Sequence, residues 1–134
     1  MCRVFHLTAL LAILLFGDIS NASSQESDIE VQLKKRADNF NEKLPARVDG
    51  STIWEKAVAG PGKRFTHIYK MTDFAGDTEQ KRTTFAKTMR PKAVTVYCTE
   101  MKSLADNGIP ISLQYVGSDD KVITDILVPP DDCR

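Results

Sequence analysis

The sequence has little that would support catalysis or the binding of a charged partner. It contains three cysteines and two histidines, too few for a histidine cluster that binds zinc, and no catalytic order of serine, histidine and aspartate can be picked out. Its 18 basic and 18 acidic residues balance, so it has no electrostatic footprint for nucleic acid or an anionic membrane. We therefore expect no catalytic residue, no metal ion, no cofactor and no nucleic-acid partner.

The apolar run near the start of the chain is also too short to span a bilayer, which needs about 20 residues. This run, Val4–Phe16, follows the basic residue Arg3, and small residues occupy positions −3 and −1 of a cleavage site after Ala22. The pattern predicts a secretory signal peptide, residues 1–22, removed to leave one α+β domain, residues 23–134. An uncleaved anchor and a buried helix are the alternatives. No cysteine follows the run directly, so we expect no lipid anchor and no stable membrane insertion.

Two cysteines, Cys98 and Cys133, remain after the predicted cleavage. In an oxidising compartment an even number of cysteines is most simply a disulfide, and a bridge between these two would stabilise the fold by roughly 4 kcal/mol on the chain-entropy model. The alternative is a catalytic Cys98 thiol with His67 as its base, which requires a reduced cysteine and leaves Cys133 unpaired.

Periodic apolar residues predict the order of the elements. Ile29, Leu33 and Ala37 form one stripe of a helix, whereas Phe65 and His67 begin an alternation typical of a half-buried strand. The expected elements are a helix over residues 25–44, two strands within residues 51–73, a helix from Asp77 that is interrupted at Pro91, and two strands within residues 109–128.

This order amounts to two αββ units of similar size. Two hairpins beside two helices favour an α+β fold in which a four-stranded antiparallel sheet has both helices packed on one face. The other sheet face would then be free for a partner, and the predicted binding residues on it are Trp54, Ile68, Val116, Ile123 and Leu127. An ordinary solvated face is the alternative, since scattered surface apolar residues are common.

Three stretches carry a resemblance to known proteins: "VDGSTIWEKAVAGPGKRFTHIYKMTD", "YCTE" and "LADNGIPISLQYVGSDDKVITDILVPPDDC". Together, over Val48–Cys133, they resemble a loose group of small exported Gram-negative bacterial proteins of uncharacterised function. The resemblance implies an envelope location and supports the disulfide, but it implies no activity. His67 stands where the group leads us to expect another aromatic residue.

These observations favour a non-enzymatic, exported protein-binding module of the bacterial envelope, periplasmic or secreted, whose partner is another envelope or secreted protein. Fold-level analogy suggests an inhibitor or immunity-type module. A structural or accessory component of an envelope or secretion assembly is the alternative. A small-ligand carrier or an enzyme would require a deep cleft around His67, Tyr69 and Tyr115.

Overall fold

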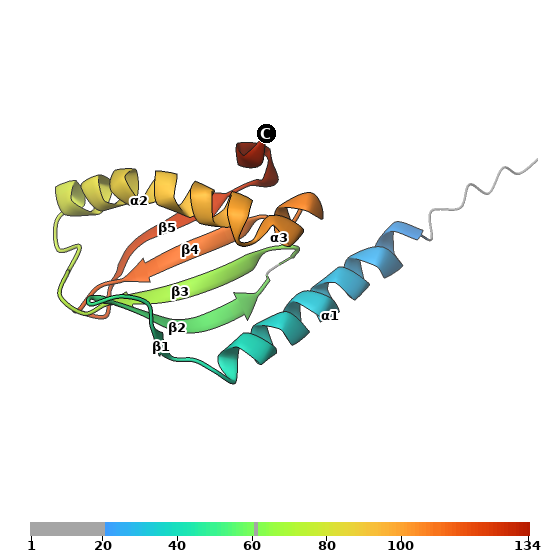
Figure 1. The fold of residues 1–134 in the computed structure, drawn as a ribbon, viewed down its shortest axis with the longest axis horizontal. Helices are drawn as coiled ribbons and strands as arrows, with labels where there is room; N and C mark the ends of the chain where they lie inside the picture. Colours follow the sequence, from blue (N-terminus) through green and yellow to red (C-terminus); the bar gives the residue numbers. More distant parts are fainter. Residues whose placement is uncertain (1–20, 61) are drawn as a thin grey trace, which may run out of the picture.

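The structure is a computed structural model that describes residues 21–60 and 62–134. All but the last two residues of the predicted signal peptide lie outside these ranges. The elements, shown in Figure 1, are helices α1 (Asn21–Asn41), α2 (Glu79–Thr99) and α3 (Lys102–Asp106), strands β1 (Ala46–Arg47), β2 (Thr52–Ala59), β3 (Phe65–Met71), β4 (Ile111–Val116) and β5 (Val122–Val128), and the short 3-10 helix η1 (Pro130–Cys133). No helix in the described part of the chain has both the length and the apolar character needed to cross a membrane.

The five strands form one mixed sheet in the order β1-β2-β3-β4-β5. The predicted four-stranded antiparallel sheet is therefore wrong in two respects. The central strands β3 and β4 are parallel, because the chain leaves β3 and returns along the sheet through α2, and a strand-helix-strand crossover makes parallel neighbours. The fifth strand, β1, has two residues, too few to leave a periodic pattern in the sequence.

The apolar stripe of α1 packs on the sheet next to β2. Leu33 and Ala37 of this stripe are buried, as expected for the core-facing side of an amphipathic helix. Asn41, the last residue of α1, fixes the end of the helix to β2: its Nδ2 donates to the carbonyl of Ala57 at 2.9 Å, and its Oδ1 accepts from the Ala57 N–H at 2.8 Å. The amide thus occupies backbone groups that β1 is too short to pair.

Helix α2 is one continuous helix, although the sequence predicted an interruption. Pro91 lies inside it, where a proline lacks the N–H for a bond to the preceding turn. The helix that was expected from Asp77 begins at Glu79. Thr78 is the N-cap, and its hydroxyl accepts from the N–H of Lys81 at 3.2 Å, while Asp77 forms an ion pair with the Lys81 ammonium at 2.8 Å.

Both long helices cover the same sheet face and share one core. Side chains from α1, α2, the end of α3 and four strands meet in it: Leu33, Ala37, Ala57, Phe65, Ala93, Tyr97, Leu104, Ile109, Ile111, Leu113, Tyr115, Ile123, Ile126 and Val128. Figure 1 shows α1 beside β2 and α2 across β4 and β5, with α1 extending beyond the sheet. The α+β class predicted from the sequence is confirmed.

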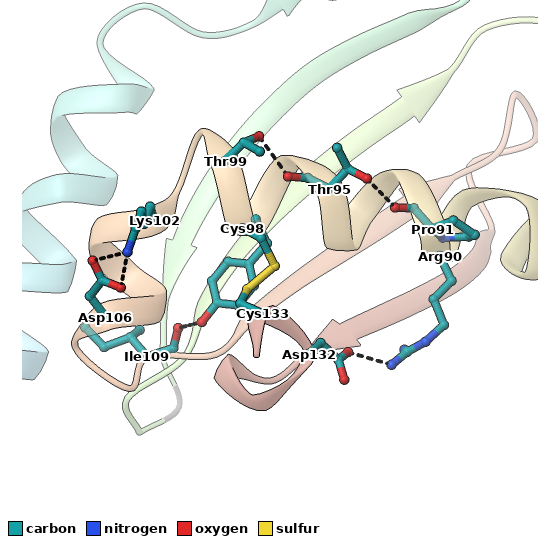
Figure 2. Close-up of a disulfide and its surroundings, with 11 residues drawn as sticks. Arg90, Pro91, Thr95, Cys98, Thr99, Lys102, Asp106, Ile109, Asp132 and Cys133 are labelled. Atoms are coloured by element: carbon teal, nitrogen blue, oxygen red, sulfur yellow. Dashed lines mark hydrogen bonds and ion pairs between the residues drawn. A yellow bond between two sulfur atoms is a disulfide. The ribbon is translucent and has the colours of Figure 1, made fainter.

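A disulfide holds the C-terminal segment against α2 (Figure 2). Cys98 of α2 is joined to Cys133 of η1. Arg90, two helical turns earlier, adds an ion pair to Asp132 at 2.8 Å and donates to the carbonyl of Leu127 at 3.1 Å. These contacts attach α2 to the end of β5 as well as to the sheet face below it.

Candidate functional site

The structure divides the predicted partner-binding residues between the two sheet faces. Trp54 lies on the face covered by the helices, because the pairing of β2 with β3 shifts register between Trp54 and Lys56. Such a bulge reverses the alternation of side chains along a strand. As a result, both Trp54 and Ala57 face the helices, although a regular strand would place them on opposite faces.

Ile123 also belongs to the core, where its side chain is 3% exposed. A second register shift, between Tyr115 and Val116 in the pairing of β4 with β5, accounts for its position. Three of the predicted residues do share the face away from the helices, namely Ile68, Val116 and Leu127, as their register with one another requires. Two of the five predicted residues, Trp54 and Ile123, therefore lie on the side of the sheet that the helices cover.

A row of aromatic side chains crosses the helix-covered face from α1 to α2. The ring centroid of Phe40 in α1 lies 5.0 Å from that of Trp54. Trp54 stacks on His67 with 4.6 Å between the ring centroids and 10° between the ring planes. Tyr69 then stacks on Tyr115 at 5.4 Å. The row ends in α2 and the loop before it, where Phe85 meets Tyr115 edge-on at 5.1 Å and stacks on Phe74 at 5.1 Å.

His67 is a neutral member of this row. Its side chain is 2% exposed, and burial, followed by the positive charge of Arg36, lowers its pKa from 6.5 to about 4. Its Nδ1 lies 3.4 Å from the hydroxyl of Tyr69. The aromatic ring that the resemblance leads us to expect at this position is thus replaced by an uncharged imidazole in the same stacked role.

The two tyrosines in the middle of the row also stay uncharged. Burial, followed by the proximity of Tyr115 and Glu100, raises the pKa of the Tyr69 hydroxyl. Burial and the negative charge of Asp49 raise the pKa of Tyr115 to about 12. The floor beneath the helices therefore combines aromatic area with neutral hydroxyl groups, a surface suited to apolar contact with a few hydrogen bonds.

Two hollows lie along the side of α2 above this floor. The hollow beside the C-terminal half of α2 has a volume of about 160 Å³ and is lined by Val48, Asp49, Thr52, Tyr69, Met89, Lys92, Ala93, Val96, Leu113 and Tyr115. The hollow beside the N-terminal half has a volume of about 530 Å³ and is lined by Phe74, Thr78, Gln80, Lys81, Thr84, Phe85, Thr88 and Met89. Met89 lines both hollows, so we treat them as one site, the α2 groove.

The α2 groove has an apolar floor and a basic wall. Helix α2 carries five basic residues, Lys81, Arg82, Lys87, Arg90 and Lys92, and one acidic residue, Glu79. Lys81 and Lys92 line the groove from α2, with Lys81 also paired to Asp77, and Asp49 lines it from the other side. On the opposite side Val48 is 57% exposed. This arrangement can hold an apolar segment whose polar edge is acidic.

Most of the groove was not predicted from the sequence. The sequence does indicate that Phe85 and Met89 begin an apolar helix face, but a helix with one apolar face would bury that face completely. Met89 and Val96, seven residues apart, line the groove together with the buried Ala93, whereas Tyr97 is buried under the helix. The apolar stripe through Phe85, Met89 and Val96 was the available signal, and the break predicted at Pro91 divided it.

The sequence also raised the question of two other kinds of site, a deep ligand cleft and a metal centre. A separate hollow of about 310 Å³ lies between α1 and α3, where Arg36 Nη1 is 3.5 Å from the hydroxyl of Ser103. This hollow is not lined by His67, Tyr69 or Tyr115; the two tyrosines line the smaller hollow of the α2 groove instead. Within the same part of the chain, no group of three or more histidine, cysteine or acidic side chains is placed to hold a metal ion.

Comparisons with known proteins show the fold and not a family. No protein-family model matches the chain, and no curated protein matches it. Among solved structures, a candidate secreted protein from Pseudomonas aeruginosa is 14% identical with a TM-score of 0.70, covering 85% of this chain and all of the other.

Two further structures with this fold are pilotins of type II secretion systems. EpsS from Vibrio vulnificus is 17% identical with a TM-score of 0.66, covering 84% of this chain and 97% of its own. AspS from Vibrio cholerae is 19% identical with a TM-score of 0.61, covering 83% and 97%. The shared fold extends over nearly the whole of each of these small proteins.

Proposed function

We propose that this protein is an exported, non-enzymatic accessory component of a Gram-negative secretion assembly, which holds a segment of another envelope protein in the α2 groove. The observation that carries the proposal is the groove itself. Apolar surface that stays accessible beside a well-packed core marks a site of interaction. Here the surface includes Phe74, Phe85 and Met89 of the wider hollow.

The size and charge of the groove define the segment that fits it. The lining residues of α2 run from Gln80 to Val96, about 24 Å along a helix at 1.5 Å per residue. An amphipathic helix of about 16 residues matches this length and presents anchors at the spacing used in helix-in-groove recognition. Acidic residues on its edge would lie beside Lys81 and Lys92.

The neighbours in fold support the assembly part of the proposal. Two of them are type II secretion pilotins, and a third is a candidate secreted protein. This favours the accessory role over an inhibitor or immunity-type module, for which no described feature argues. The predicted signal peptide, residues 1–22, agrees with a periplasmic or secreted location.

Site-specific photo-crosslinking in the source bacterium tests the proposal. A photoreactive phenylalanine would replace Met89 or Val96 in the groove and, as a matched control, Val31 of α1, which is 67% exposed. We expect the two groove positions to crosslink to the same segment of one secretion-assembly protein, identified by mass spectrometry, and the control position not to do so.

Binding of the identified segment as a synthetic peptide provides the second measurement. Met89→Glu should weaken its binding at least tenfold, because it introduces a negative charge into the apolar floor beside an acidic segment. Val31→Glu should leave the affinity unchanged. Equal crosslinking from position 31, or a peptide affinity that Met89→Glu leaves unchanged, would refute the proposed function.

A further inference from the structure

Within residues 21–60 and 62–134, no helix packs over the sheet face away from α1 and α2. Its outward side chains come from four strands and form three cross-strand rows: Ile53, Lys70, Val116 and Val122; Lys56, Ile68, Gln114 and Asp125; Val58, Thr66, Ser112 and Leu127. We call this surface the open face. Val122 and Leu127 on it are 51% and 46% exposed.

The open face carries a positive charge at its β2 edge and a negative charge at its β5 edge. The middle row begins with the cation of Lys56 on β2 and ends with the carboxylate of Asp125 on β5, with Ile68 and Gln114 between them. Both terminal residues are exposed. Lys70 in the next row forms an ion pair with Asp120, so its charge is already balanced within the chain.

The positions of this pattern on β2 and β5 complement one another under a two-fold rotation, whereas the same rotation sets Lys70 over Val116 and Ile68 over Gln114 on the central strands. An axis parallel to the strands, midway between β3 and β4, places β2 of one copy over β5 of the other at the same height along the strands. Lys56 then faces Asp125 of the second copy, and Asp125 faces its Lys56. The outer rows bring Val58 over Leu127 and Ile53 over Val122, so apolar residues meet on both sides of the ion pairs.

We infer that the open face binds a second copy of this chain in a two-fold symmetric, face-to-face dimer. Opposite charges and apolar residues at matching positions are what an isologous interface requires. The open face spans four strands spaced about 4.8 Å apart, so the dimer buries an area near the lower end of specific interfaces. We therefore expect a reversible dimer with a dissociation constant of roughly tens of micromolar.

Charge reversal tests this geometry by sedimentation analysis of the chain from residue 23. Lys56→Glu and Asp125→Lys each place two like-charged pairs in the homodimer, and each should weaken it at least tenfold. Mixed together, the two variants should form a heterodimer with native affinity. The introduced glutamate of one chain then faces the introduced lysine of the other, while the native Asp125 and the native Lys56 still face each other. Val31→Glu, an exposed apolar position on α1, is the control.

Asp125→Lys also removes the hydrogen bond that Ser112 donates to Asp125, and this loss could by itself alter the sheet. A second pair of variants avoids this side effect. Val58→Glu and Leu127→Lys leave that hydrogen bond intact. Each should weaken the homodimer, whereas a mixture of the two variants gains an ion pair between the introduced glutamate and the introduced lysine. A native chain that stays monomeric at millimolar concentration, a dimer insensitive to Lys56→Glu, or folded variants that do not recombine would overturn the inference. None of these results bears on the α2 groove, which lies on the opposite face.

Discussion

At the scale of single residues, His67 shows how the same side chain leads to opposite functional interpretations. In the sequence it is a candidate base for a cysteine nucleophile. In the structure it is a buried ring between Trp54, Phe65 and Tyr69, and the thiol it would have to activate, Cys98, is in a disulfide with Cys133. Periodicity predicted that His67 lies in a strand, but only the bulge in β2 brings Trp54 onto it.

The buried neutral state of His67 predicts an acid-sensitive stability. Its pKa is about 4 in the folded chain and about 6.5 when unfolded, so protons bind the unfolded state more readily. The stabilisation is complete above pH 6.5 and is lost as the pH falls towards 4, by about 3 kcal/mol in total. Urea unfolding measured between pH 7 and 4 should show this loss.

The matched control for that measurement is His67→Phe, which keeps an aromatic ring in the row and removes the titrating group. It should lose about 3 kcal/mol less stability over the same pH range. The difference between the two chains isolates the histidine from the carboxylates that both contain. Parallel pH profiles for the two chains would contradict the burial argument.

At the scale of elements, regular patterns were predictable and irregular ones were not. The stripe of α1 and the alternation of β3 and β4 follow from periods of 3.6 and 2 residues. The bulges next to Trp54 and at Ile123 do not, because a bulge is selected by packing on both faces of the sheet. Those two bulges account for both residues that the sequence placed on the wrong face.

Pro91 provides a prediction for α2. It lies inside the helix and is exposed, and it cannot donate a backbone hydrogen bond to the preceding turn. Pro91→Ala restores the donor and should raise the free energy of unfolding by about 1 to 3 kcal/mol, measured by urea denaturation. Thr95→Ala, which removes the exposed hydroxyl bonded to the Pro91 carbonyl, should change it by less than about 0.5 kcal/mol. A less stable Pro91→Ala chain would mean that the packing of α2 requires the proline at this position.

At the scale of the whole molecule, the sequence predicted the class and the order of elements but not the sheet. Its two hairpins were each read correctly as antiparallel pairs. What joins them is decided by α2, whose length carries the chain back along the sheet before β4 begins. Local patterns contain no information about that pairing, since β3 and β4 meet through residues about 46 positions apart, as Phe65 and Ile111 do.

The disulfide predicts how strongly the molecule depends on its C-terminal attachment. Replacing Cys98 and Cys133 together by serine should lower the free energy of unfolding by about 4 kcal/mol, because the unfolded chain regains the entropy of an open loop. Native chain treated with a reductant should show the same loss in urea denaturation, and the double variant should not respond to the reductant. Equal stability with and without the bridge would contradict this expectation.

The parallel pairing of β3 with β4 also determines when, during folding, the edge of β3 is protected from pairing with other chains. When β2 and β3 have formed their hairpin, the far edge of β3 has no neighbour until β4 arrives after the whole of α2. During that interval an apolar strand that carries Phe65 and Tyr69 offers free backbone donors and acceptors to any other extended chain. The newly made protein is therefore most exposed to misassembly before α2 has crossed the sheet, a stage at which neither the disulfide nor the groove yet exists.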